Sequence, residues 1–565
     1  MIILYFLSGA LLFALAYRFY GRYLERKMGL SDDNVTPACR LEDGVDYIPT
    51  SDTVLFGHHF SSIAGAGPIV GPIVAGLAFG WLPAALWIVI GAIFVGGVHD
   101  YTAMAASIRN DGRSIGEICR TLLPRPIYMA FLVFIVFTLI YVIIVFLDLT
   151  ASGFAPDSPT PESARQGGAV ACSAVLYIFL ALAFGFVVYR RRCSLLGASL
   201  IFVPLVFVAM YVGMRWPLLP EYLPTVGSSV KNFWIIILLV YCLLASVLPV
   251  WMLLQPRDYL SSFLLYACLI GGTVGLIIAG FQGEATIQYP AFIGWRDSHL
   301  GPMFPALFIT IACGAVSGFH SIVASGTSAK QLRRESSARR IGYGGMLIEG
   351  LLALLALAAV MILSKKSGNN PVQIFADGLG VFIGALGFNA DVASTFGMLA
   401  VSTFLLTTLD TCTRLARFVV QEFFGLQGNL RNRILITLGV LAIPAIVTFQ
   451  NIHGPDGRLM PAWQAVWPAF GASNQLLAAL ALLCVFMWLR RSRLPTWFAG
   501  VPLVFMTVTT MVALRQLSWA NLCGGSRFIG IFSLILLLLA VAILAGACLM
   551  LWRTRSATGH TRAET

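Results

Sequence analysis

Seven ionisable side chains lie inside long apolar stretches of this sequence, where they are the residues best suited to chemistry. They are His58, His59, His99, Asp100, His320, Glu349 and Asp410. Burying such a group at membrane depth is costly, so each is a candidate for a functional site. Histidine titrates near neutral pH, which suits these imidazoles to carrying protons or contacting a polar solute. The structural alternative, that each is a capped or paired group, stays open for any one of them.

Histidine and aspartate are also metal ligands, so a Zn²⁺ or iron site built from these side chains is the main competing chemistry. No spacing among them is typical of such a site. Adjacent His58 and His59 point about 100° apart on a helix, so both rarely reach one ion. We therefore expect no cofactor and no transition metal. The sequence also lacks Walker A, GxSxG, HExxH and haem-attachment motifs, which argues against an enzyme and against ATP-driven activity.

Glycine and proline are concentrated in two apolar segments. Residues 57–72 have the sequence GHHFSSIAGAGPIVGP, and residues 304–327 contain GAVSGFHS and end in SGT. Such residues leave backbone groups unpaired at membrane depth, which is tolerated only where they face protein or a wet cavity. Broken helices of this kind form the substrate and ion sites of many secondary transporters. For the first segment we favour a site over the alternative that the glycines only allow close helix packing.

The two breaks supply the candidate solute-binding residues. They are His58, His59, Ser61, Gly65, Ala66, Gly67, Gly314, Ser317 and His320. Half-helices that begin after a break present free N–H groups and partial positive charge, which suit a carboxylate. We expect the solute to bind between the breaks near the membrane midplane, with the histidines as polar partners or proton carriers.

A third apolar stretch carries hydroxyls and a carboxylate, at Thr407, Thr408, Asp410 and Thr411. These side chains are hard oxygen donors of the kind that Na⁺ prefers, which indicates a sodium site. Alternatively, Asp410 carries the coupling proton. The alternative is an ion pair from Asp410 to Arg414, one helical turn on. The other candidates for cation or proton coupling are His99, Asp100 and Glu349.

The composition requires a membrane around these residues. Of 565 residues, 58% are hydrophobic and 11% are charged, against about 25% charged in an average soluble domain. Apolar runs of about 18 residues or more recur along the chain, and each can span the hydrocarbon core. The net charge of +12 does not indicate nucleic-acid binding, because the basic residues lie in short clusters between apolar runs, which is the pattern of membrane topology.

An all-α polytopic membrane protein with about 15 transmembrane helices is therefore predicted. The spans are 2–20, 57–80, 82–107, 126–149, 168–189, 194–214, 232–254, 259–280, 302–325, 343–364, 391–420, 433–449, 464–489, 495–514 and 527–552. With the N-terminus outside and the C-terminus inside, most of the 37 Lys and Arg residues fall inside, as the positive-inside rule requires. The first run lacks a basic n-region and a cleavage site, so it is predicted to be a retained span.

The order of the spans resembles the 5+5 inverted repeat of LeuT-like transporters, because two five-helix groups of opposite orientation each open with a broken helix. The single membrane domain, residues 1–565, divides accordingly. Its parts are 2–56 (first helix and cytoplasmic loop), 57–214 (first repeat), 232–280 (two inserted helices), 302–489 (second repeat), 495–552 (C-terminal helices) and 553–565 (cytoplasmic tail). Residues 371–388 are apolar enough for a re-entrant or interfacial helix.

Two further groups of residues are predicted to be structural. The eleven cysteines are scattered singly, without a CxxC pair, so we expect small core residues rather than disulfides or metal ligands. Asn474 and Gln475 are expected to form hydrogen bonds between helices rather than to bind a ligand.

Several motifs resemble those of the carbon starvation protein A (CstA) family. They are DYIPT at 46–50, VLFGHHF at 54–60, GAGPIVGP at 65–72, RSIGE at 113–117, LPVW at 248–251 with QPRDY at 255–259, and the segments 311–320, 406–417 and 467–475. The resemblance covers most of the chain. It implies a bacterial inner-membrane carrier of the amino acid–polyamine–organocation (APC) superfamily, in a family whose members transport peptides or pyruvate when carbon is scarce.

Together these features predict an ion-coupled secondary transporter, not an enzyme, that takes up a small carboxylate-bearing nutrient, a peptide or pyruvate, across the inner membrane during carbon starvation. The expected partners are that solute, Na⁺ or H⁺ as coupling ion, and the lipid bilayer. No nucleic acid is expected, and the oligomeric state is left open. The alternatives are a solute sensor or channel, and a metal-binding membrane redox protein that uses the histidine cluster.

Overall fold

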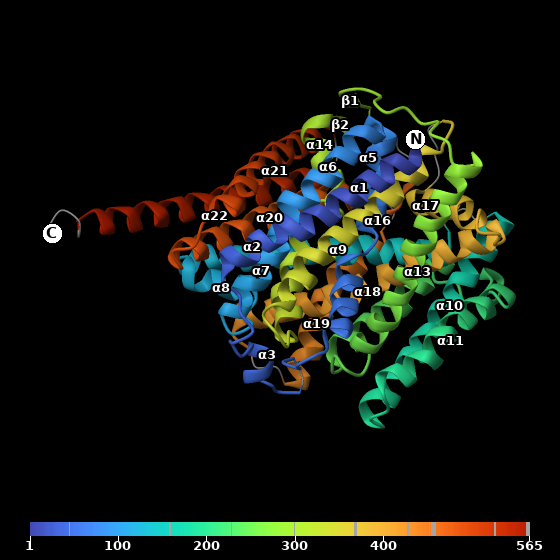
Figure 1. Ribbon diagram of the computed structural model, residues 1–565, viewed down its shortest axis with the longest axis horizontal. Coiled ribbons are helices and arrows are strands. Elements are labelled where there is room, and N and C mark those ends of the chain that lie inside the picture. The colour runs from blue at the N-terminus through green and yellow to red at the C-terminus, as the bar shows by residue number, and fades with distance from the viewer. Residues whose placement is uncertain are drawn as a thin grey trace.

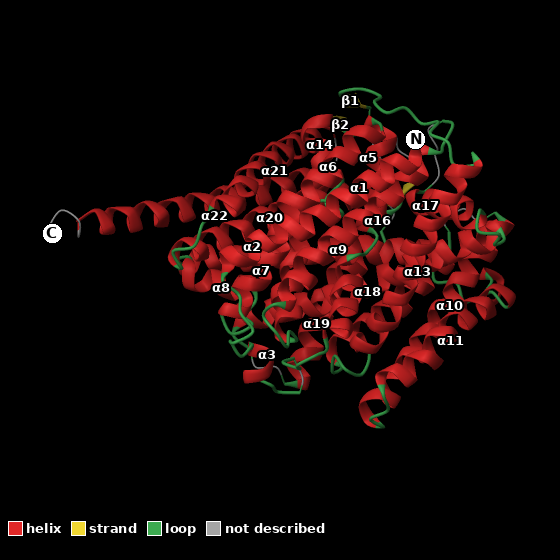
Figure 2. Cartoon of the chain, in the orientation of Figure 1, coloured by secondary structure: helices red, strands yellow, loops and turns green. Residues whose placement is uncertain are grey.

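The computed structural model describes residues 1–565 except 45, 157–159, 228, 299, 366–369, 427–428, 451, 454–458, 525–526 and 561–565. Helices make up almost all of the described chain, and the long ones pack side by side in one bundle from which α22 projects (Figure 1). Loops join the helices (Figure 2), and the described residues also form two short antiparallel strand pairs. These are β1 (Arg296–Asp297) with β2 (Gly301–Pro302), and β3 (Ile452–His453) with β4 (Leu459–Met460).

The helices of the first half run from the N-terminus to the long helix α13. They are α1 (Ile2–Ala16), α2 (Arg22–Met28), α3 (Pro37–Arg40), α4 (Asp52–Ile63), α5 (Gly67–Phe79), α6 (Trp81–Gly91), α7 (Gly97–Arg109), α8 (Ile115–Leu122), α9 (Arg125–Phe154), α10 (Pro161–Gly185), α11 (Leu195–Arg215), α12 (Val230–Val247) and α13 (Leu254–Gln282). Single π-helical turns join α1 to α2 and α6 to α7, so each pair is one continuous helix.

The helices of the second half follow a loop that contains β1 and β2. They are α14 (Met303–Thr310), α15 (Gly318–Gly326), α16 (Gly344–Met361), α17 (Pro371–Gly384), α18 (Ala390–Phe424), α19 (Leu430–Thr448), α20 (Ala462–Arg491), α21 (Trp497–Gly524) and α22 (Arg527–His560). The tail predicted over 553–565 is helical as far as His560, and residues 561–565 lie outside the described part of the chain.

Within the described residues, twelve helices are long and apolar enough to cross a membrane, and the bent pair of α4 and α5 brings the count to thirteen. The all-helical membrane fold is therefore confirmed. The other two predicted spans coincide with the broken pair of α14 and α15 and with α22. The count of about fifteen, the N-out/C-in orientation and the 5+5 repeat stay predictions. The short apolar helix α17 occupies the predicted re-entrant or interfacial segment.

Four helices form the interior of the bundle, namely α9, α16, α18 and α20. The most apolar window of α20 is 94% buried and that of α9 is 78% buried, whereas the windows of α11 and α19 are each 22% buried. Three of the inner helices carry polar residues discussed below, namely α16, α18 and α20. The outer helices present apolar side chains outward, as contact with lipid requires.

Both predicted helix breaks are confirmed. α4 and α5 are bent by 41° across residues 64–66, and residues 311–317 separate α14 from α15. Gly314 lies in the second break with φ +88°, a conformation that favours glycine. A Cβ atom on Gly71 of α5 would lie 2.5 Å from the carbonyl oxygen of Thr310, so glycine is needed for the close approach of α5 to the end of α14. The two broken helices therefore contact each other beside their breaks.

One end of the bundle is closed by two loop segments, which we call the loop cap. The loop cap consists of residues 30–50 and 327–338. The backbone N–H of Thr50 donates to the carbonyl of Gln331 at 3.0 Å. Asp32 accepts hydrogen bonds from the backbone N–H and the hydroxyl of Ser336, and the backbone hydrogen bond holds the pKa of Asp32 below its ordinary value. The loop that precedes α4 is thus bound to the loop that follows α15.

The prediction that no cysteines pair is wrong. Cys119 on α8 and Cys484 on α20 form a disulfide, with their Cα atoms 5.8 Å apart. The two residues are 365 positions apart in the sequence, so the pairing depends on the tertiary fold and leaves no local spacing signal. The other eight cysteines among the described side chains are free.

Candidate functional site

A cavity of about 250 Å³ lies between the two helix breaks, and we call it the break cavity. It is lined by the two breaks and by α9, α18 and α20. The lining residues are Ile63, Gly65, Gly67, Val142, Phe146, Cys313, Ser317, Phe319, Thr408, Phe470 and Asn474. None of these residues is charged. Four of them, Gly65, Gly67, Ser317 and Thr408, belong to the residues predicted from the sequence.

Two helices begin at the break cavity, α5 at Gly67 and α15 at Gly318. The first backbone N–H groups of a helix have no partner within it and carry partial positive charge. Oδ1 of Asn474 accepts a hydrogen bond from one of these groups, the N–H of Phe319, at 2.9 Å. Nδ2 of Asn474 donates to the hydroxyl of Ser317 at 3.0 Å. The predicted hydrogen bonding of Asn474 between helices is therefore confirmed, and the same side chain also lines the cavity.

The three histidines predicted to bind the solute are fully buried, but they do not line the break cavity. On α4, His58 Nδ1 lies 2.7 Å from a carboxylate oxygen of Asp258, and His59 Nδ1 lies 2.8 Å from the hydroxyl of Ser328. His320 on α15 faces Asp100 instead. Neighbouring histidines on one helix thus reach different partners, as their angular separation requires.

A buried ion-pair network on α13 and α18 was not predicted from the sequence. The Arg257 guanidinium contacts Asp258, Asp410 and the hydroxyl of Tyr241, and the Tyr177 hydroxyl donates to the carbonyl of Arg257. Nη2 of Arg257 donates to Oδ1 of Asp410 at 3.1 Å. All three charged side chains are buried. We call Arg257, Asp258, Asp410 and Tyr241 the Arg257 network.

The alternative ion pair from Asp410 to Arg414 is not formed. Arg414 instead lies 3.2 Å from Asp46 of the loop cap and donates to the carbonyl of Leu248. The partner that Asp410 has in the structure is Arg257, which lies in the polar segment 255–258 just before Tyr259. The predicted span began at Tyr259, which placed Arg257 and Asp258 in a loop, whereas α13 begins at Leu254 and buries both.

The threonines of α18 have separate surroundings. The Thr407 hydroxyl donates to the carbonyl of Ser61 at 3.0 Å, and this contact ties α18 to α4. The Ser61 hydroxyl in turn donates to the carbonyl of Asp258 at 3.0 Å. Thr408 lines the break cavity, while Thr411 lines a second cavity. The structure therefore does not gather the hydroxyls of Thr407, Thr408 and Thr411 around the Asp410 carboxylate.

The second cavity, of about 370 Å³, lies between α18 and the loop cap, and we call it the loop cavity. Its lining residues are Asp46, His58, Val250, Leu254, Gly326, Thr327, Lys330, Gln331, Thr411, Arg414, Leu415 and Phe418. Nε2 of His58 has no hydrogen-bond partner among the described atoms. His58 thus connects the loop cavity, through Asp258, to the Arg257 network.

The remaining predicted residues form a cluster around Asp100, which joins α7, α15 and α16. One oxygen of Asp100 lies 2.7 Å from His99 Nδ1 and the other lies 3.0 Å from His320 Nδ1. Glu349 accepts the backbone N–H of Gly314 at 3.2 Å. The cluster therefore holds the second helix break against α7 and α16. Of the other two predicted residues, Gly314 reaches this cluster, while Ala66 lies buried in the first break next to the cavity-lining Gly65 and Gly67.

Comparison with known proteins finds that a family model described as carbon starvation protein CstA matches residues 1–370 and 365–513. The peptide transporter CstA of Escherichia coli K12 is 31% identical, over 89% of this chain and 79% of that protein. The pyruvate/proton symporter BtsT of the same organism is also 31% identical, over 89% of this chain and 80% of that protein. Among solved structures, a manganese transporter of Eremococcus coleocola has a TM-score of 0.46 and 13% identity, over 91% of this chain and 99% of that one.

Proposed function

Because this chain belongs to the carbon starvation protein CstA family, we propose that it is a proton-coupled carrier that takes up a small monocarboxylate. The chain is a multi-pass protein of the inner membrane. We propose pyruvate as the preferred solute and dipeptides as the weaker candidates. Uptake across the inner membrane would proceed by alternating access to the break cavity.

The observation that carries this proposal is the break cavity with two helices beginning at its wall. The partial positive charge at the N-termini of α5 and α15 would favour an anion there without a charged side chain. Some of the first N–H groups already have partners, since Phe319 donates to Asn474 and Ile69 donates to the carbonyl of Ala66. The amide of Asn474 and the hydroxyls of Ser317 and Thr408 add polar contacts for a keto oxygen. The aromatic rings of Phe146, Phe319 and Phe470 leave little room for a second charged group.

The charge of the break-cavity lining favours pyruvate over a dipeptide. A dipeptide carries an ammonium group, which would be left in this cavity without a carboxylate partner, since no lining residue is acidic. Pyruvate has a single charge, and the helix N-termini can compensate it.

For the coupling ion we propose a proton at the His58–Asp258 pair. His58 lines the loop cavity, from which a proton can reach its ring, and its Nδ1 contacts the Asp258 carboxylate. A proton on His58 would strengthen the ion pair between α4 and α13, so its arrival and release would alter how the first broken helix packs. Sodium is less favoured because the Asp410 carboxylate is already bound by Arg257 and Tyr241.

Uptake by purified protein in proteoliposomes tests the proposal. We expect saturable uptake of labelled pyruvate driven by an inward proton gradient, and weaker uptake of a labelled dipeptide. With a gradient of about one pH unit, one-to-one symport supports about tenfold accumulation, since that gradient is worth about 1.4 kcal/mol. Folded protein that takes up neither solute, or that requires a sodium gradient, would contradict the proposal.

His58→Gln is expected to abolish accumulation driven by the proton gradient while leaving exchange of labelled for unlabelled pyruvate intact. Glutamine keeps a hydrogen bond to Asp258 but cannot take up the proton. The matched control is His59→Gln, because the neighbouring histidine is equally buried but contacts the uncharged Ser328. Equal loss of accumulation in both variants, or full accumulation in His58→Gln, would place the proton elsewhere.

A further inference from the structure

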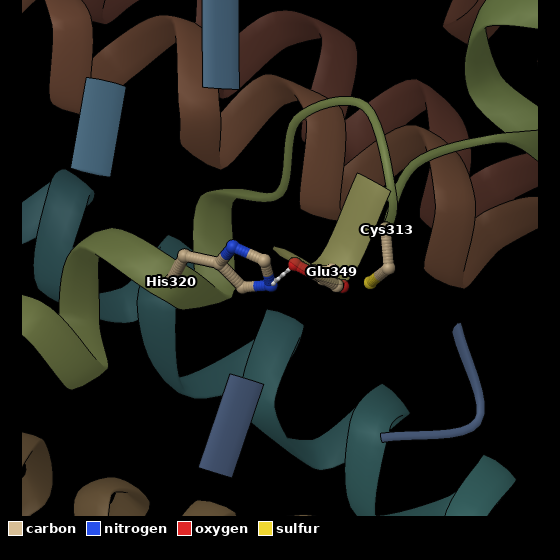
Figure 3. Close-up of side chains that lie close together, drawn as sticks. All are labelled: Cys313, His320 and Glu349. Carbon is tan, nitrogen blue, oxygen red and sulfur yellow. Dashed lines mark ion pairs between the residues drawn. The ribbon is translucent and has the colours of Figure 1, made fainter. Parts of the chain in front are cut away.

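One group of side chains beside the second helix break combines Cys313, which lines the break cavity, with His320 and Glu349, to which the proposed carrier mechanism assigns no role. Cys313 lies before α15, His320 lies on α15 and Glu349 lies on α16, and all three are buried. The thiol, the imidazole and the carboxylate each offer an atom within 4.8 Å of the other two. Figure 3 shows the His320 ring on one side of the Glu349 carboxylate and the Cys313 thiol on the other.

Two members of this group, His320 and Glu349, each use one side-chain atom in a hydrogen bond and keep a second one outside it. His320 Nδ1 contacts Asp100 at 3.0 Å, and Glu349 Oε1 accepts the N–H of Gly314 at 3.2 Å. His320 Nε2 and Glu349 Oε2 have no hydrogen-bond partner among the described atoms and face each other as an ion pair at 3.4 Å (Figure 3). That separation is longer than the usual N–H···O hydrogen bond of about 2.7–3.2 Å.

The same separation fits a shared metal ion. With a metal–nitrogen distance of about 2.1 Å and a similar metal–oxygen distance, tetrahedral geometry separates the two ligand atoms by about 3.4 Å. A thiolate sulfur at about 2.3 Å from the same ion would lie about 3.6 Å from the nitrogen. The Cys313 thiol is within 4.8 Å of the other two ligand atoms, so it would have to move closer by about 1 Å to reach that position.

The surrounding contacts are those of a histidine metal ligand. In many metal sites the ligating histidine donates its other N–H to a carboxylate, which fixes the ring and its tautomer. Asp100 has this position relative to His320, and His99 contacts the other oxygen of Asp100 at 2.7 Å. Asp100 is therefore a positioning residue for the group, not a ligand.

We propose that Cys313, His320 and Glu349 bind Zn²⁺. A thiolate ligand disfavours Mg²⁺ and Ca²⁺, whereas one sulfur, one nitrogen and one oxygen ligand suit the borderline-soft Zn²⁺. The thiolate and the carboxylate together balance the charge of the ion in this buried place. Such an ion would link the segment before α15 to α15 itself and to α16, and would leave a fourth position for water. This site differs from the expectation, drawn from the sequence, of no metal.

Metal binding by the purified protein tests this inference without any measurement of uptake. Protein in detergent is stripped with a chelator, incubated with Zn²⁺, desalted and analysed for metal content. We expect about one Zn²⁺ per chain in the wild type, as for a single three-residue site, and loss of that ion in Cys313→Ser. The matched control is Cys268→Ser, a free cysteine that is also buried but lies on α13, and it should keep the ion.

A second measurement separates ligation from misfolding. The wild type loaded with Co²⁺ should show a thiolate-to-cobalt charge-transfer absorption, which disappears in Cys313→Ser and stays in Cys268→Ser. Asp100→Asn should keep this absorption but weaken Zn²⁺ affinity by about 10- to 100-fold, because it changes only the outer partner of His320. Wild-type protein that binds no Zn²⁺, or that binds it equally in Cys313→Ser, would overturn this inference. Because neither measurement depends on uptake, that result would leave the proposed uptake of pyruvate untouched.

Discussion

Replacing Gly67 with leucine is expected to abolish pyruvate uptake while the protein still inserts into the membrane. A Cβ atom at this position would lie 2.5 Å from both Cβ and Sγ of Cys313, and the rest of the side chain would occupy the break cavity. Overpacking costs about 1–3 kcal/mol of folding stability, and the leucine side chain also fills the space in which the solute is proposed to bind. The measurement is initial uptake rate in proteoliposomes at equal protein content.

Gly439→Leu on the peripheral helix α19 is the control for this substitution, because a Cβ atom at Gly439 meets no heavy atom within 4 Å. It should transport at the wild-type rate. Gly67→Ala provides an intermediate step, with a partial loss. Normal uptake by Gly67→Leu, in protein that elutes as a single species, would mean that the solute does not bind between the breaks.

Arg257→Met is expected to destabilise the folded protein by about 3–5 kcal/mol, the usual cost of leaving a buried charge without its partner. The substitution keeps much of the side-chain volume but leaves the carboxylates of Asp258 and Asp410 facing each other without a cation. The measurement is unfolding in detergent followed by size-exclusion chromatography after heating. The double variant Arg257→Met/Asp410→Leu should be less destabilised than the sum of the two single variants, because both charges of one pair are removed.

Arg113→Met serves as the control for loss of an arginine. Its ion pair with Glu117 spans 3.6 Å, and the two side chains are 44% and 39% exposed. Exposed pairs of this kind contribute about 0–1 kcal/mol, so this variant should unfold close to the wild type. Equal effects of Arg113→Met and Arg257→Met would contradict the role assigned to the Arg257 network.

Local patterns in the sequence were sufficient to locate the two breaks and the membrane fold. The glycines near Gly65 and Gly314 predicted the breaks because a helix break depends on residues within a few positions. The partners of the buried charges could not be predicted in the same way. His58 and Asp258 are 200 positions apart, and their contact depends on how α4 and α13 pack.

Two errors in the predictions have different physical origins. Arg257 was missed because the start of its helix was placed after it, and hydropathy defines helix ends less well than helix interiors. The pairing of Cys119 with Cys484 was missed because it depends on the contact of α8 with α20. Ser317 was found because it lies in the second break, whereas Thr408 was found as one of the hydroxyls in the third apolar stretch.

The loop cap has a mechanical consequence for a carrier of the proposed kind. It binds the segment before the first broken helix to the segment after the second, through contacts such as Thr50 with Gln331 and Asp32 with Ser336. The two broken helices also contact each other where Gly71 meets Thr310. We therefore expect the two broken helices to move together in such a carrier. The surface along which they would slide is the face that they present to α9, α18 and α20, and it divides the lining of the break cavity.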